Sequence, residues 1–103
     1  MVELLEIVTL ESRRGLKLSG EVDISNVTQL ADSLSRQMAE AEDLHLDLAD
    51  LEFIDGAGVR VLVQAARRLP RGRRVVLWSA PNFLRRLLAV LKVDESSGLL
   101  VAG

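Results

Sequence analysis

The sequence predicts an α/β fold, with one domain over residues 1–103, a mixed sheet of four to five strands and about three main helices. The chain has 103 residues, 49% of them hydrophobic, which is the size of one domain with one core. Segments of strand character come first, and in the second part they alternate with amphipathic helical segments. This alternation implies right-handed crossovers and a partly parallel sheet, covered by helices on at least one face.

The first half of the chain is predicted to form a hairpin followed by a helix. Residues 3–10 and 15–20 are apolar or alternating and flank a polar run, as the strands of a hairpin do. Turn and N-cap chemistry follows at Gly20, Asp23 and Ser25. A helix of about four turns comes next, because apolar residues recur there at helical spacing: Val27, Leu30, Ala31, Leu34 and Met38.

A strand and a second helix are predicted in the middle of the chain. Residues 44–48 alternate with period two, as a strand does. The second helix runs from about Gly56 to Leu69 and is ended by Pro70 and Gly72.

The last third is predicted to add a strand and a third helix. Residues 75–78 form a short apolar run that is typical of a covered central strand. Pro81 suits the first position of a helix. The inward-facing residues of that helix are predicted to be Leu84, Leu87, Leu88 and Leu91. Residues 99–101 either add an edge strand or fray.

The composition argues against several classes of protein. A net charge of −2 and a pI of about 5.4 give no bulk attraction to nucleic acid or anionic lipid. Without cysteine there are no disulfides, thiolate metal sites or cysteine nucleophiles. No run approaches the roughly 18–20 apolar residues that cross a bilayer, and Glu3 and Glu6 stand where a signal peptide would carry positive charge. We therefore expect a cytoplasmic protein without membrane insertion.

Charge is distributed unevenly along the chain. Residues 1–55 hold thirteen acidic and four basic residues (net −9), whereas residues 56–92 hold nine basic residues and no acidic one (net +9). One interpretation is an acidic set of strands and loops beside an arginine-rich pair of helices. The other is a polarised molecule that docks in one orientation on a charged partner.

Nothing in the sequence indicates an enzyme. The single histidine, His45, lies in an alternating strand with no nucleophile at a recognisable spacing. The spacing of Asp47 and Asp55 does not predict that they meet, and His45 with scattered acids makes no metal-ligand pattern. Residues 55–58 lack the length and the Lys-Ser/Thr of a phosphate-binding loop. We predict no catalytic residue, no metal site and no cofactor.

A basic run at residues 67–74 holds five arginines in eight residues. Such a run could engage phosphates, but no aromatic residue is interleaved to stack on bases and the protein as a whole is acidic. Arg67 and Arg68 are better explained as cations in the last turn of a helix, where they complement its dipole. No direct contact with nucleic acid is expected.

The segment that opens the second helix combines cap and turn chemistry. Phe53 and Ile54 end a strand and deliver Asp55, whose carboxylate can cap the helix. Gly56 and Gly58 allow a tight turn and the close approach of another surface. Physical chemistry alone leaves two interpretations open here, a well-capped turn and a binding surface.

Three blocks of the sequence stand out together: residues 20–23 (GEVD), residues 46–59 (LDLADLEFIDGAGV), and Ser79-Ala80-Pro81 with residues 85–88 (RRLL). In this order they resemble the STAS domain family, which includes anti-sigma factor antagonists and the cytoplasmic domains of sulfate transporters. The resemblance spans nearly the whole chain in the right order. It implies a single STAS-like domain, a small mixed sheet backed by helices, and a role in protein–protein switching.

The resemblance also implies a partner and a switch. Stand-alone bacterial members bind an anti-sigma factor kinase and so free a sigma factor; the kinase phosphorylates a Ser or Thr in the loop that opens the second helix. The corresponding position here is Ala57, preceded by Gly56. Because alanine has no hydroxyl, the usual switch cannot operate there. We expect either a member fixed in the binding-competent, unphosphorylated-like state or a member recruited for a task without phosphorylation. Ser25 and Thr28 are weak alternative acceptors.

The predicted partner-binding residues lie in two loops that precede helices. Both loops are expected to leave one end of the sheet and border one surface. Val61 lies off the predicted core stripe, so an exposed apolar contact and a second buried face are both open. The set is Asp23, Ser25, Asn26, Asp55, Gly56, Ala57, Gly58 and Val61.

Three functions are compatible with these features. The first is a cytoplasmic antagonist of an anti-sigma factor kinase. The second is a soluble STAS subunit of an ABC-type transporter, which needs separate permease and ATPase chains. The third is a scaffold subunit of a signalling complex, with salt-sensitive contacts between its acidic and basic halves.

Overall fold

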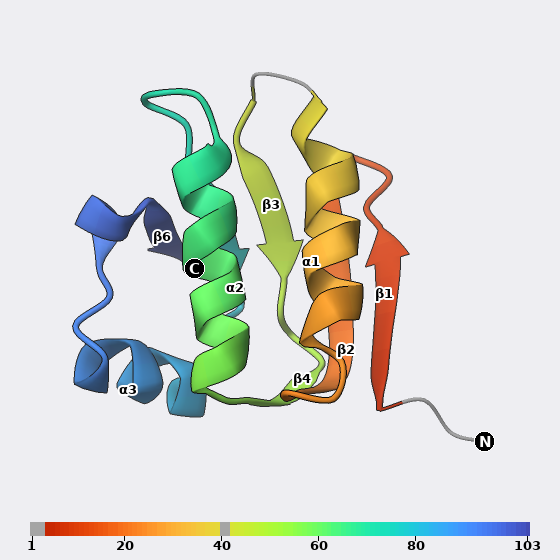
Figure 1. The fold of residues 1–103 in the computed structure, drawn as a ribbon, viewed down its shortest axis with the longest axis vertical. Helices are drawn as coiled ribbons and strands as arrows, with labels where there is room; N and C mark the ends of the chain where they lie inside the picture. Colours follow the sequence, from red (N-terminus) through yellow and green to blue (C-terminus); the bar gives the residue numbers. More distant parts are fainter. Residues whose placement is uncertain (1–3, 40–41) are drawn as a thin grey trace.

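The computed structural model describes residues 4–39 and 42–103, so Glu3, which the sequence places in the first strand, lies outside the described residues. The chain runs strand, strand, helix, two strands, helix, strand, helix, strand, with two short 3₁₀ turns (Figure 1). The elements are β1 Leu5–Thr9, β2 Gly15–Val22, α1 Val27–Arg36, η1 Gln37–Ala39, β3 Leu44–Asp47, β4 Leu51–Ile54, α2 Gly56–Arg68, β5 Val75–Trp78, α3 Asn82–Val90, η2 Glu95–Ser97 and β6 Leu99–Ala102.

The strands form a single mixed sheet in the order β1-β2-β3-β5-β6. β1 and β2 are the antiparallel hairpin, and every other pairing is parallel, so the predicted α/β class with a partly parallel sheet is confirmed. The described residues hold six strands rather than four to five, because β4 pairs with the second half of β2 while β3 pairs with the first half. Residues 99–101 belong to β6, which closes the far edge.

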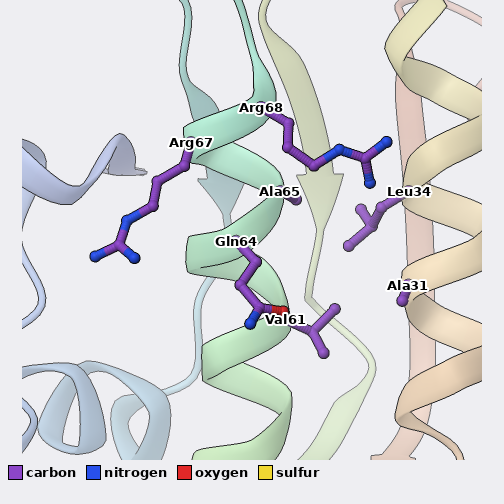
Figure 2. A pocket seen from close by; sticks show the side chains of 7 residues that line it. All are labelled: Ala31, Leu34, Val61, Gln64, Ala65, Arg67 and Arg68. Carbon is purple, nitrogen blue, oxygen red and sulfur yellow. The ribbon is translucent and has the colours of Figure 1, made fainter.

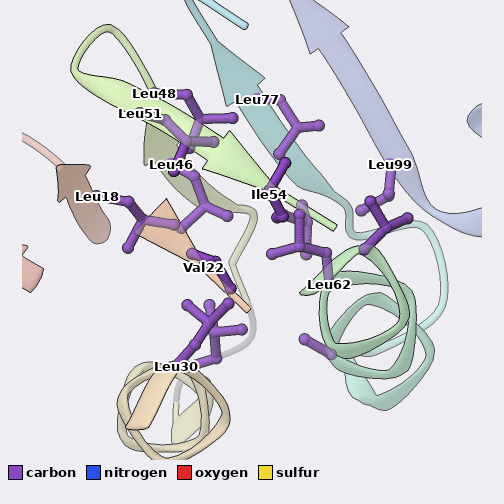
Figure 3. Packing of buried hydrophobic residues seen from close by; sticks show 14 of the residues in the cluster. Leu18, Val22, Leu30, Leu46, Leu48, Leu51, Ile54, Leu62, Leu77 and Leu99 are labelled. Atoms are coloured by element: carbon purple, nitrogen blue, oxygen red, sulfur yellow. The ribbon is translucent and has the colours of Figure 1, made fainter. Parts of the chain in front are cut away.

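Helices α1 and α2 lie side by side across one face of the sheet, and α3 lies at the end where both begin (Figure 1). Their apolar stripes meet the inward side chains of the strands, as Figure 3 shows for Leu30 of α1 and Leu62 of α2. Burial of these side chains removes apolar surface from water and provides most of the stabilisation. The most deeply buried members include Leu18, Leu34, Leu44, Leu46, Leu77 and Leu84.

Side chains on the other face of the sheet are mostly polar or half-buried. Lys17 and Trp78 both lie opposite Asp47 in the parallel ladders, and His45 precedes Asp47 by two residues. The side chains of Lys17, His45 and Trp78 therefore all point to this face. The indole N–H of Trp78 donates to Nδ1 of His45 over 2.9 Å, and the Arg13 guanidinium lies 4.9 Å from the indole centroid. His45 is therefore a structural acceptor beside Trp78.

Acidification is expected to break the His45–Trp78 bond. Burial, and then the nearby charge of Arg13, hold the pKa of His45 below its usual value of about 6.5. The unfolded chain therefore binds the proton more tightly, so stability is full above about pH 6.5 and falls as the pH drops through the lowered pKa. Fluorescence of the single tryptophan, followed through urea titrations at several pH values, measures this directly.

The matched control for this pH dependence is His45→Gln, which cannot titrate. Its unfolding free energy should vary less with pH just below 6.5. A wild-type step centred above pH 6.5, or an equal step in the variant, would contradict the assignment.

The C-terminus of α3 differs from the prediction. The helix starts at Asn82, with Pro81 at the N-cap position, and ends at Val90, so Leu91 is not an inward helical residue but is 44% exposed. The Lys92 N–H donates to Ala89 O and the Val93 N–H to Leu88 O, which is the Schellman ending of a helix. Lys92 occupies its left-handed position, with φ 57°, where glycine is the usual residue.

Lys92→Gly is expected to raise the free energy of unfolding by about 1 kcal/mol, because it relieves the left-handed strain of a residue with a Cβ. Lys92→Ala removes the charge but keeps the Cβ, and should change stability much less. Urea denaturation of both variants, followed by Trp78 fluorescence, measures the difference. An equal gain in both would assign the effect to the charge.

Candidate partner-binding surface

Two loops meet at the end of the sheet where α1 and α2 begin (Figure 1). β2 and β4 run parallel with Val22 opposite Ile54, so the loops that leave these strands emerge together. The Asp55 N–H donates to Val22 O over 3.3 Å and ties one loop to the other. This geometry places the two loops side by side at one end of the sheet.

Asp55 starts α2. Its backbone is extended (φ −100°, ψ −175°) and its carboxylate accepts from the N–H of Gly58 over 3.1 Å, which satisfies one of the free amides of the helix N-terminus. Such a cap stabilises a helix by about 1 kcal/mol. Gly56 and Ala57 follow in the first turn; Gly56 is exposed and Ala57 is half-buried.

Gly58 lies beneath this surface. A Cβ there would sit 2.5 Å from Cγ1 of Ile54 and 2.9 Å from Cγ1 of Val22, so the missing side chain lets α2 begin against the sheet. Gly58 is buried. The proposed contact surface therefore excludes it, and its role here is packing.

The loop before α1 is held by its own polar side chains. The Asp23 carboxylate accepts from the N–H of Ser25 over 2.8 Å and from its hydroxyl, and these bonds lower the pKa of Asp23. Asn26 accepts from the Asp23 N–H over 3.0 Å and donates to Glu21 O over 2.9 Å. The predicted N-cap role of Asp23 and Ser25 is wrong: Asn26 occupies the cap position, and its side chain braces the loop rather than the helix.

Ile24 is the residue of this surface that the sequence analysis missed. Its side chain is 77% exposed, in the loop between Asp23 and Ser25. A large apolar side chain this exposed gains by being covered, and an interface can cover it. Its position in the sequence could have indicated this exposure, because the isoleucine lies between two polar loop residues and outside the apolar stripe of the helix that follows.

Val61 lines a groove of about 370 Å³ between α1 and α2. Figure 2 shows its side chain in the space between the helices, facing Ala31 and Leu34 of α1. Val61 is half-buried against the core cluster, which supports the second of its two interpretations, a buried face. At the far end of the groove, Arg68 Nη1 donates to Ser35 Oγ over 2.9 Å.

This end of the molecule presents an exposed apolar side chain (Ile24), a helix start without large side chains (Gly56 and Ala57) and two carboxylates (Asp23 and Asp55). Within the described residues there is no group of three or more metal-ligating side chains. In the same part of the chain, no helix combines the length and apolar character needed to cross a membrane.

The comparisons with known proteins identify the family. The family model described as "Mlab, STAS domain" matches residues 8–102. The chain therefore belongs to the STAS domain family, as the three sequence blocks indicated. A search of curated proteins finds no match.

Solved structures with the same fold include anti-sigma factor antagonists and one chain of a larger complex. An anti-sigma factor antagonist from Mycobacterium paratuberculosis has a TM-score of 0.80 and 18% identity, over 93% of this chain and 85% of that one. The Bacillus anti-sigma factor antagonist SpoIIAA, in its unphosphorylated form, has a TM-score of 0.71 and 18% identity, over 96% and 88%. A chain of the Acinetobacter MlaFEDB complex in an ATP-bound conformation has a TM-score of 0.70 and 22% identity, over 92% of this chain and 100% of that one.

Proposed function

We propose that this chain is a regulator that acts by binding another protein, as an anti-sigma factor antagonist does, with an anti-sigma factor kinase as its partner in the bacterial cytoplasm. The contact surface consists of Ile24, Gly56 and Ala57, bordered by the carboxylates of Asp23 and Asp55. We call this set the docking surface. The family, and the anti-sigma factor antagonists that share the fold, support the proposal.

The alanine at position 57 is the observation that supports this mode of action. A phosphoryl group in the first turn of α2 would add about −1.5 to −2 charges beside Asp55. Such a group repels an acidic partner surface and loses its hydration against an apolar one. The methyl group of Ala57 cannot accept phosphate. The docking surface therefore stays in its binding-competent form, and binding is controlled by the amount of protein rather than by this modification.

A second candidate is a subunit of an ABC-type transporter. It is favoured by the similarity to the whole of one chain of the MlaFEDB complex, and a subunit docked without a phosphorylation switch has no need of a hydroxyl at position 57. Both candidates use the docking surface, and they differ in the partner that covers it.

Affinity capture from cytoplasm and from solubilised membranes tests the proposal, with wild type and Ala57→Glu as matched baits and mass spectrometry as the readout. A soluble histidine-kinase-like ATPase that is captured by wild type and lost with Ala57→Glu supports the antagonist. A permease with its transport ATPase, lost in the same way, supports the transporter subunit. Equal capture of one partner by both baits would contradict the docking surface.

A further inference from the structure

A second groove, of about 400 Å³, lies between α2 and the segment that follows α3, and it shares Gln64 and Arg67 with the groove between α1 and α2. Figure 1 shows the segment after α3 beside α2, on the side away from α1. Its apolar lining includes Val63 on α2, with Leu91 and Val93 on the facing segment. Gly56 lines it as well, so the groove is continuous with the docking surface. We call it the α2 groove.

The apolar side of the α2 groove is left open by the fold. Leu91 is 44% exposed within it, and the neighbouring Val90 is 76% exposed. Val90 does not line the groove, so the open apolar surface within it is that of Leu91. The ending of α3 at Val90 places Leu91 here instead of in the core.

The charged side chains that line the groove are all cations. Arg60 and Arg67 lie on α2, about two turns apart. In Figure 2 the side chain of Arg67 points away from α1, whereas that of Arg68 points toward it. The ion pairs of the described residues join Lys17 to Asp50 and Arg74 to Glu95, so neither groove arginine has an acidic partner there.

The chain sequence reinforces this positive charge. No acidic residue occurs from position 56 to position 93; Asp94 and Glu95 follow directly, and Glu95 pairs with Arg74. Lys92, which lies in the sequence between the lining residues Leu91 and Val93, is an exposed cation.

We infer that the α2 groove binds an acidic segment of the partner protein that carries apolar anchor side chains. The anchors insert between Val63 and Leu91, and flanking carboxylates pair with Arg60 and Arg67, for which the guanidinium fork is well suited. No aromatic side chain lines the groove to stack on a base, which favours a protein segment over a nucleic acid. The inference rests on the proposed function, because it assigns the chemistry of the same partner.

The test uses the full chain and two synthetic helical peptides, one of leucine and glutamate in an amphipathic pattern and one with lysine in place of every glutamate. Binding is followed by NMR of methyl-labelled protein. The expected result is a shift of the Val63, Leu91 and Val93 methyl signals with the acidic peptide, and at least tenfold weaker binding of the basic one.

Charge-reversal variants test whether peptide binding depends on the groove arginines or on the net charge of the whole protein. Arg60→Glu and, independently, Arg67→Glu should each weaken the acidic peptide at least tenfold. Arg86→Glu, the same change on the exposed face of α3, should leave it within about twofold. All three positions are exposed, and the NMR spectrum itself reports that each variant is folded.

Similar binding of both peptides, shifts confined to another surface, no binding of the acidic peptide, or an equal loss with Arg86→Glu would each overturn the inference. The peptide experiment contains no partner protein. Its failure would leave the comparison of wild-type and Ala57→Glu baits intact, so the two proposals fail separately.

Discussion

Ala57→Glu is expected to weaken partner binding at least tenfold, equivalent to about 1.4 kcal/mol. The glutamate places a negative charge in the first turn of α2, next to the N-cap residue Asp55, where the wild type presents a methyl group. Burying that charge in an interface without a cationic partner is costly. Titration calorimetry against the captured partner measures the change.

The same substitution should leave the melting temperature unchanged or slightly raised, because a carboxylate in the first turn of a helix interacts favourably with the helix dipole. The matched control is Ala89→Glu, the same change on the exposed face of α3, which should bind as wild type does. Equal affinities for wild type and Ala57→Glu would remove this loop from the interface. A large fall in melting temperature would instead assign the loss to unfolding.

Gly15→Ala is expected to lower the free energy of unfolding by about 3 kcal/mol. Gly15 begins β2 with φ 153° and pairs with His45 of β3. A Cβ there would sit 1.8 Å from the carbonyl oxygen of His45, which is backbone in the middle of the sheet and has no rotamer to change. Relief would require β2 and β3 to separate. Urea denaturation followed by Trp78 fluorescence measures the loss.

Gly56→Ala is the matched control, because a Cβ at Gly56 would meet nothing within 4 Å and the residue is helical. It should be neutral or stabilise by up to about 1 kcal/mol. If Gly15→Ala cost no more than Gly56→Ala, the close β2–β3 contact would be wrong.

Periodicity made most of the fold predictable. In the hairpin and the three helices, apolar residues recur with the spacing that buries one side of the element, and the strand at 75–78 is continuously apolar because both of its faces are covered. β4 was predicted only as the end of a strand, because Leu51–Ile54 has two exposed residues between two buried ones and so lacks the alternation of a strand. Its pairing with β2 depends on a partner about thirty residues earlier in the chain, which no local pattern records.

Some features of the candidate surface were likewise predictable from the sequence, and others were not. The cap by Asp55 was predictable because capping is local chemistry between residues three apart. The burial of Gly58 and the exposure of Leu91 were not, since the first depends on Val22 across the sheet and the second on where α3 ends. The proposed role of Ala57 depends on the family resemblance, because an alanine side chain has no functional group that would indicate a site.

The most direct test of the account is to incubate the wild-type chain with its captured partner and ATP, and to measure intact mass and affinity before and after. The account predicts no added phosphoryl group and unchanged affinity. With a kinase partner, Ala57→Ser should gain one phosphoryl group and lose binding. Phosphorylation of the wild-type chain, at Ser25 or Thr28 for example, accompanied by loss of binding, would contradict a docking surface that stays permanently competent.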